Sequence, residues 1–231
     1  MKAAELRIFI GYDSREPIAY AVLADSIMRR ASMPVSITPL RLPSLTHAYT
    51  RSRGAAESTE FSLTRFLVPY LSNYEGLSLF LDCDMLMQAD VAELLVYPLA
   101  YPDKAVHVCQ HDYTPRDQVK FLGQTQTAYP RKNWSSVMLS DNAHCTALTP
   151  AYVNTATGLQ LHRFQWLDDA QIGALPLEWN HLVNEPGQSD AEPKNIHFTR
   201  GGPWFPEYAE CPYADRWLQA LAEMHGQAVL A

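Results

Sequence analysis

The chain of 231 residues is 47% hydrophobic and 19% charged, and 25 acidic residues against 18 basic ones give it a formal net charge of −7. An acidic balance without a basic run argues against a nucleic-acid partner. No linker, repeat or block of charge divides the chain, so its length suits one α/β domain over residues 1–231.

Cysteine usage and hydropathy indicate the compartment. The 4 cysteines form no CxxC pair, which is typical of buried, reduced thiols and not of a zinc or disulfide framework. The apolar start of the chain is short for a signal peptide and is interrupted by Arg7. No stretch is long and apolar enough to span a bilayer. We therefore expect a cytoplasmic protein without a transmembrane segment.

Strands and helices alternate in the first third of the chain. The run LRIFIGY predicts a buried strand over 6–12, and the Glu-Pro pair that follows suits the start of a helix over 16–31. A second strand is predicted over 35–42. Apolar residues spaced for one face then predict a helix over 61–71, with Arg65 on its polar side.

Short apolar runs predict further strands in the rest of the chain. The run LSLFL predicts a central strand over 77–81. We also expect strands over 105–109 and 137–139, an edge strand at 196–198, and a C-terminal helix over 213–228 with inward-facing Trp217, Leu218 and Leu221. This alternation implies a mostly parallel sheet covered by helices on both faces.

Carboxylates follow two of the predicted strands. In parallel α/β sheets ligands bind beyond the carboxyl ends of the strands, and Asp13 and Asp82 lie at such ends. Asp82 and Asp84 are separated by one residue, so their charges repel unless a cation lies between them. Carboxylate oxygens suit Mg²⁺ or Mn²⁺. The same pattern also fits Asp84 as a cap of the segment that follows.

The segment HFTRGGPW contains the second group of candidate residues. Gly201 and Gly202 would let the backbone approach a ligand closely. Arg200 is suited to binding a diphosphate through charge-assisted hydrogen bonds. Taken alone, His197 is more typical of a hydrogen-bonded structural histidine than of a ligand, and the two glycines are more typical of a turn.

Four features occur in a fixed order between about Arg7 and Trp204. They are a strand that ends in aspartate, a helix that carries an arginine, the motif FLDCDM and the motif HFTRGGPW. In this the chain resembles the retaining glycosyltransferases of the glycogenin and lipopolysaccharide galactosyltransferase type. It is more closely similar to a bacterial group of family-eight-like nucleotide-diphospho-sugar transferases. The resemblance implies the GT-A fold, a single Rossmann-like α/β domain with a mixed, mostly parallel sheet and helices on both faces.

The resemblance also implies roles for individual residues. Asp82, Asp84 and His197 match the ligands that hold Mn²⁺ (or Mg²⁺) against the donor diphosphate. Asp13 matches a carboxylate that contacts the nucleotide base, and Arg65 matches a helix arginine that approaches the donor.

Asp169 matches a carboxylate near the sugar, which it would stabilise or attack, and the motif around it keeps the Trp179-Asn180 pair. Arg200 would stabilise the departing diphosphate, with Gly201 and Gly202 beside the donor and with Lys120 or Lys132 as further cations. The implied donor is a nucleotide-diphospho-sugar, with a UDP-sugar favoured. The acceptor is unidentified, and transfer with retention of configuration is expected.

The chain departs from the pattern of these enzymes in three places. Gly202 stands where they usually have a lysine, the spacing from His197 to Pro203 is one residue shorter than in the commonest form, and Trp134 replaces an expected asparagine. Arg200 is the candidate for the missing cation, and the change at Trp134 bears on the identity of the sugar more than on the diphosphate site.

Alternatives remain at the level of residues and of function. Asp13 suits a helix cap, Arg65 a solvated charge, and Asp168 or Asp169 the start of a helix. A haloacid-dehalogenase-like phosphatase also places DxD after a strand, but it needs a lysine before a second aspartate pair, and residues 133–167 contain none. A sugar nucleotidyltransferase needs a glycine-rich loop after the first strand. A non-catalytic nucleotide-sugar binding module would keep most of the same residues.

Overall fold

The computed structural model describes residues 5–54, 57–112, 119–120, 124–125 and 131–226. Its strands and helices are, in chain order, β1 (Leu6–Gly11), α1 (Pro17–Arg30), β2 (Val35–Leu40), α2 (Val68–Leu71), β3 (Leu77–Leu81), β4 (Met85–Met87), α3 (Val96–Ala100), β5 (Val106–Cys109), β6 (Val119–Lys120), β7 (Gln124–Thr125), β8 (Val137–Asp141), α4 (Pro150–Thr155), α5 (Gly158–His162), β9 (Ile172–Leu175), β10 (His181–Leu182), β11 (Asn195–His197) and α6 (Ala214–Met224).

The main sheet has six strands in the order β2-β1-β3-β8-β5-β9. β1 pairs in parallel with β2 and β3, and β5 pairs in parallel with β9, whereas β8 is antiparallel to both of its neighbours. Every strand except β8 therefore points in the same direction, and the expectation of a mixed, mostly parallel sheet is confirmed. A smaller sheet has the order β10-β11-β4.

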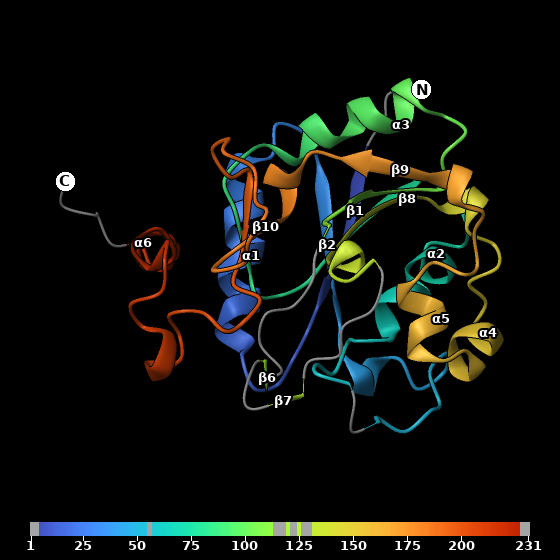
Figure 1. Ribbon diagram of the computed structural model, residues 1–231, viewed down its shortest axis with the longest axis horizontal. Helices are drawn as coiled ribbons and strands as arrows, with labels where there is room; N and C mark the ends of the chain where they lie inside the picture. Colours follow the sequence, from blue (N-terminus) through green and yellow to red (C-terminus); the bar gives the residue numbers. More distant parts are fainter. Residues whose placement is uncertain (1–4, 55–56, 113–118, 121–123, 126–130, 227–231) are drawn as a thin grey trace.

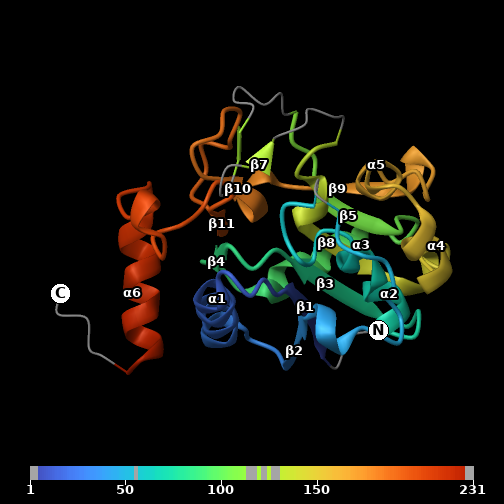
Figure 2. The same ribbon diagram turned by 90° about the horizontal axis from the view of Figure 1, so that it is seen from below.

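Helices cover both faces of the main sheet. Figure 1 shows the alternation of strands and helices, and Figure 2 shows α1 on one side of the sheet and α2, α4 and α5 on the other. The residues Ile8, Phe9 and Ile10 are all buried because β1 is covered on both faces, which explains its continuous apolar run. None of the helices among the described residues is long and apolar enough to cross a bilayer.

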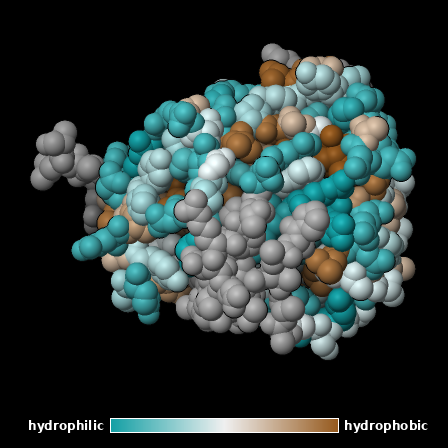
Figure 3. Space-filling model, in the orientation of Figure 1, coloured by the Kyte–Doolittle hydropathy of each residue, from teal (hydrophilic) through white to brown (hydrophobic). Residues whose placement is uncertain are grey.

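The outer surface is mixed in character. The face in Figure 3 is largely hydrophilic, with hydrophobic residues in scattered patches. The helix α6 lies outside α1, and its Trp217 is buried in a second apolar cluster that also contains Val22 of α1 and Phe198. This cluster connects the C-terminal helix to the smaller sheet.

Three expectations about the elements are wrong in detail. The helix expected over 61–71 is a 3-10 helix at Thr64–Leu67 followed by the short α2, which has Pro69 in its first turn, where a residue without an N–H is tolerated. The strand expected at an edge near 196–198 is β11, the central strand of the smaller sheet. Leu218 is 49% exposed, because the apolar stripe of α6 is narrower than expected.

Candidate functional site

The acidic pair lies where the main sheet passes into the smaller sheet. β3 is buried in the centre of the main sheet, and Asp82 follows it directly, with its backbone N–H donating to Ser136 O at 3.1 Å. Asp84 is followed by the strand β4 and not by a helix, so the helix-cap interpretation of Asp84 is wrong. Asp82 therefore lies at the carboxyl edge of the sheet, as expected.

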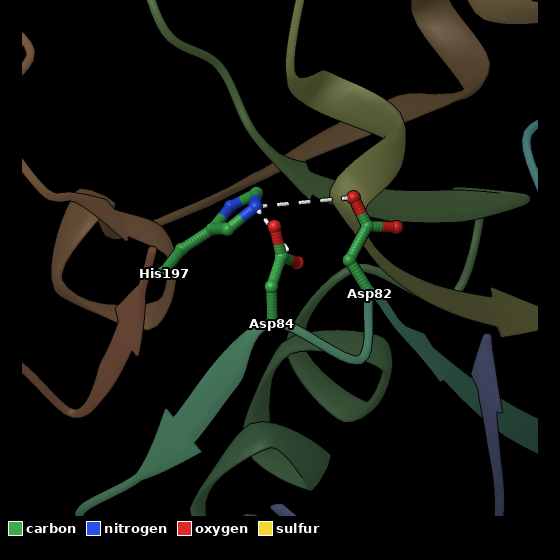
Figure 4. Close-up of side chains that lie close together, drawn as sticks. All are labelled: Asp82, Asp84 and His197. Atoms are coloured by element: carbon green, nitrogen blue, oxygen red, sulfur yellow. Dashed lines mark ion pairs between the residues drawn. The ribbon is translucent and has the colours of Figure 1, made fainter. Parts of the chain in front are cut away.

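Strand pairing brings the histidine to the acidic pair. β11 is antiparallel to β4, with His197 opposite Met85, and the backbone N–H of Phe198 donates to Asp84 O at 2.8 Å. His197 Nε2 lies 3.3 Å from Asp84 Oδ1 and 3.9 Å from Asp82 Oδ2 (Figure 4). The side chain of His197 is only 2% exposed. Segments that are far apart in the sequence thus converge on one point.

The three side chains form a group that fits a metal ion. One ligand atom from each of Asp82, Asp84 and His197 lies within 4.8 Å of the other two. Two carboxylate oxygens and an imidazole nitrogen are donors that suit Mn²⁺ and Mg²⁺, with Mn²⁺ accepting the nitrogen more readily. The structure therefore brings these three side chains together as a candidate metal site.

A buried asparagine fixes the orientation of the imidazole. His197 Nδ1 lies 2.8 Å from Asn180 Oδ1, and Asn180 Nδ2 donates to Asn133 O at 3.1 Å. Asn180 was noted in the sequence only as half of a Trp-Asn pair, and no role was predicted for it. Its position beside His197 could not have been read from the sequence, because residues 180 and 197 meet only through the pairing of β10 with β11.

Arg65 contacts Asp82 and does not lie on a solvated helix face. Its Nη1 lies 2.7 Å from Asp82 Oδ1 and donates to Ser135 O at 2.9 Å. The guanidinium lies over the rings of Phe61 and Phe80, at 5.3 and 4.9 Å from their centroids. Arg65 is buried, so the alternative of a solvated charge is wrong.

Asp13 is fully buried beside the start of α1. Arg15 donates to both of its carboxylate oxygens, at 2.8 and 2.6 Å, and the backbone N–H of Glu60 donates at 3.1 Å. Burial would raise the pKa of Asp13, but hydrogen bonds from Arg15 and Glu60 lower it below its ordinary value. Glu16 occupies the N-cap position of α1, so Asp13 is not the helix cap. In this conformation Asp13 connects two loops at the ligand edge.

Glu16 is a buried carboxyl group that the sequence analysis considered only as the start of a helix. Its Oε1 accepts from Cys83 Sγ at 3.5 Å, and its Oε2 accepts from Trp204 Nε1 at 3.2 Å. Burial, with the neighbouring charges of Asp84 and Asp13, raises the pKa of Glu16 to about 8. Glu16 thus connects the residue between the two aspartates to the HFTRGGPW segment. A glutamate before a helix gave no signal for this contact.

A second histidine, His111, lies near the group and was also missed. It follows β5 at the carboxyl edge of the sheet and is 5% exposed. Burial and the neighbouring His197 together lower its pKa to about 4, against a hydrogen bond with the backbone of Asn180. His111 is therefore neutral at pH 7.

The glycines of the HFTRGGPW segment lie close to two aromatic rings, Trp204 of the segment and Tyr208 beyond it. A Cβ at Gly202 would lie 2.1 Å from the Trp204 ring, and one at Gly201, where φ is +121°, would lie 2.5 Å from the Tyr208 ring. Packing within the segment thus explains Gly202, while the positive φ and the nearby Tyr208 explain Gly201. Arg200 Nε donates to the buried Glu185 at 2.8 Å, which holds the guanidinium in place.

Asp169 does not lie with this group. It precedes β9, whereas Asp82 follows β3, and both strands point in the same direction. Asp169 is 81% exposed and pairs with Arg131 at 2.5 Å. The expected position of Asp169 beside the sugar is therefore not supported, because the strand direction separates it from Asp82. Asp168 begins a 3-10 helix, as the alternative interpretation expected.

Two lysines were expected as further cations, and the structure describes the side chain of one of them. Lys132 is buried, immediately before Asn133 at the ligand edge. Lys120 lies in β6, and its side chain is outside the described part of the chain.

Solved structures share this architecture. The bifunctional glycosyltransferase WbbM matches 97% of this chain with a TM-score of 0.65 at 16% identity, and the chain spans about half, 52%, of that protein. Galactosyltransferase LgtC, solved with donor and acceptor sugar analogues, gives a TM-score of 0.54 at 9% identity over 97% of both chains. Mouse xyloside xylosyltransferase 1 gives 0.52 at 11% identity, covering 84% of this chain and 97% of its own. The fold is that of the GT-A glycosyltransferases, so the resemblance inferred from the sequence is confirmed at this level.

The family follows from a closer relative. Protein CDI of Arabidopsis thaliana is 48% identical over 225 residues, which cover 94% of this chain and 86% of that protein. The chain therefore belongs to the family of Protein CDI. No protein-family profile matches the sequence.

Proposed function

We propose that this protein is a metal-dependent glycosyltransferase that moves a sugar from a nucleotide-diphosphate donor, favouring a UDP-sugar, to a hydroxyl group of an acceptor. The observation that carries the proposal is the convergence of Asp82, Asp84 and His197 at the carboxyl edge of a GT-A sheet. Ligands of α/β sheets bind at this edge. The likeness to galactosyl- and xylosyltransferases supports a sugar nucleotide as the donor.

The charges at the site favour a divalent cation. Asp82 and Asp84 together carry two negative charges, and Arg65 compensates one of them through its contact with Asp82. The other oxygen of Asp82 and one oxygen of Asp84 face His197 Nε2, at 3.9 and 3.3 Å. A divalent ion held there, Mn²⁺ or Mg²⁺, would stabilise the negative charge that develops on the departing diphosphate.

Other residues of the chain would position the donor. Arg200 is preorganised by Glu185, so it offers a fixed positive charge from the segment that carries His197. Lys132 is a further cation at the same edge. Asp13 and its partner Arg15 fix the loop before α1, which in this proposal lies beside the nucleotide base. Retention of configuration is part of the proposal and rests on the family-eight resemblance alone.

Binding of nucleotide-sugars in the presence and absence of Mn²⁺ tests the proposal. A ligand at about one hundred times its dissociation constant raises the free energy of unfolding by roughly 2.7 kcal/mol, which a thermal-shift panel detects. We expect a UDP-sugar to raise the melting temperature of the wild type only when Mn²⁺ is present. It should not raise the melting temperature of Asp82→Asn or Asp84→Asn, with or without Mn²⁺. Asp141→Asn, at the far end of β8, is the control and should respond like the wild type. A metal-independent shift, or an unchanged shift in both variants, contradicts the proposal.

Two other functions use the same fold or motif. A binding module without catalysis predicts the same thermal shifts but no release of UDP from a UDP-sugar, so turnover separates it from a transferase. A phosphatase needs a second aspartate pair beside Asp82. The only pair expected from the sequence, Asp168 and Asp169, lies at the amino end of β9, which weighs against this function.

A further inference from the structure

Asn180 lies between the two sheets that form the candidate metal site. It is fully buried, in the segment that connects β9 of the main sheet to β10 of the smaller sheet. Through Nδ2 it donates to the backbone oxygen of Asn133, which lies just before β8. Through Oδ1 it contacts the ring of His197, which ends β11. One side chain therefore bonds to both halves of the site.

The contact with Asn133 determines which way round the amide lies. A carbonyl oxygen only accepts, so the group that faces Asn133 O at 3.1 Å is the NH₂ of Asn180. The amide oxygen must then face His197 Nδ1, at 2.8 Å. An amide oxygen also only accepts, so the hydrogen between the two residues is on the imidazole. His197 carries its proton on Nδ1.

This tautomer leaves the metal-facing nitrogen free. In a neutral imidazole only one nitrogen is protonated, so a proton on Nδ1 leaves Nε2 with its lone pair. Nε2 is the atom that lies 3.3 Å from Asp84 and 3.9 Å from Asp82. Metal-ligating histidines commonly donate their other N–H to an oxygen acceptor that fixes the ring.

We propose that Asn180 is a positioning residue for the metal site, which holds His197 in the Nδ1–H tautomer with Nε2 directed at Asp82 and Asp84. The inference rests on the proposed metal-dependent function, but the hydrogen bond from Nδ1–H to Asn180 does not need the ion and is measurable in the metal-free protein. Asn180 does not contact the ion or the donor in this role. It acts through the ring that does.

Asn195 provides a matched control. It is also a fully buried asparagine, one residue from Ile196 on β11, and its Nδ2 donates to Trp179 O at 3.1 Å. Replacing it with alanine removes a buried amide of the same size from the same region. It leaves the contact between Asn180 and His197 in place, so it reports the general cost of losing a buried hydrogen bond.

The first measurement uses the metal-free wild type. Long-range ¹H–¹⁵N correlation spectra distinguish a protonated imidazole nitrogen from a bare one, and the signals of His197 are identified by their absence in His197→Gln. We expect the proton on Nδ1 in the wild type and in Asn195→Ala. An Nδ1 without a proton overturns the inference, whether or not the protein proves to be a transferase.

The second measurement is the affinity for Mn²⁺ alone, from electron paramagnetic resonance or calorimetry. Asn180→Ala should weaken Mn²⁺ binding roughly 10- to 100-fold, while Asn195→Ala should change it by less than about threefold. Asn180→Asp keeps an acceptor for Nδ1–H and should restore Mn²⁺ binding to within a few-fold of the wild type. Equal losses in Asn180→Ala and Asn195→Ala, or no rescue by aspartate, contradict a positioning role. If wild-type protein does not bind Mn²⁺, the proposed function fails, and the spectra still decide the tautomer.

Discussion

The guanidinium of Arg65 lies 2.7 Å from the carboxylate of Asp82 and is buried against the rings of Phe61 and Phe80. One oxygen of Asp82 therefore faces a permanent cation, while the other faces His197. An arginine in this position restrains the rotation of the carboxylate. It also compensates part of the negative charge at the site when no metal is bound.

Replacing Arg65 tests this role. Arg65→Ala should lower the free energy of unfolding of the metal-free protein by about 3–5 kcal/mol, because a buried carboxylate loses its partner. Mn²⁺ should then stabilise the variant more than it stabilises the wild type, because the ion supplies the missing charge. Denaturant unfolding with and without Mn²⁺ measures both effects.

The exposed pair of Arg29 and Asp25 offers a control for that experiment. Arg29→Ala removes an arginine from a solvent-screened contact on α1, so it should change stability little and leave the effect of Mn²⁺ as in the wild type. If Arg65→Ala behaves like Arg29→Ala, the contact between Arg65 and Asp82 does not organise the site.

Glu16 predicts a particular pH dependence of stability. Its pKa is raised to about 8 in the folded protein, from an ordinary value of 4.5. Between these values the folded state keeps a proton that the unfolded state has lost, so stability falls as pH rises. The slope from this group approaches about 1.4 kcal/mol per pH unit and disappears above the folded pKa.

The variant Glu16→Gln isolates that contribution, because glutamine keeps a side chain of the same shape and does not ionise. The difference in unfolding free energy between Glu16→Gln and the wild type should grow in favour of the variant from pH 5 to pH 8. Urea denaturation at several pH values, without metal, measures it. A difference that stays constant over this range would show that Glu16 ionises in the folded protein as it does in water.

The parts of the fold that follow from local pattern were predictable. β3 begins and ends at the expected residues, 77–81, because a strand buried on both faces is a continuous apolar run. Asp82 could be placed at the ligand edge for the same reason. The helix expected over 61–71 was wrong, since apolar spacing does not distinguish a regular helix from two short turns around Pro69.

The parts that depend on pairing between distant segments were not predictable from pattern. His197 reaches the acidic pair through β4 and β11, which are strands of three residues each. Only the family resemblance predicted that His197 lies beside Asp82 and Asp84. Neither Asn180 nor Glu16 belongs to a periodic pattern, so the sequence held no signal for their contacts. The exposure of Asp169 depends on the direction of β9, a strand that was not predicted from the sequence.

Asp169 gives a direct comparison between resemblance and geometry. A carboxylate that stabilises or attacks the sugar predicts that Asp169→Asn abolishes turnover of a UDP-sugar. The structure places this side chain in an exposed pair with Arg131, so we expect Asp169→Asn to retain turnover within about threefold and to bind Mn²⁺ as the wild type does. Release of UDP, measured beside Asp84→Asn as the inactive reference, decides between them.

The glycines of the HFTRGGPW segment give the last prediction. A methyl group at Gly202 would overlap the Trp204 ring, so Gly202→Ala must displace the indole that donates to Glu16. Overpacking of this kind costs about 1–3 kcal/mol. We expect lower stability and a shift in tryptophan fluorescence that reports loss of the contact with Glu16. Gly158→Ala is the control, since its nearest neighbour lies at 3.7 Å and alanine favours the helix it begins. If Gly202→Ala is as stable as Gly158→Ala, packing against Trp204 is not the reason for glycine, and close approach to a ligand, which the sequence first indicated, becomes the better explanation.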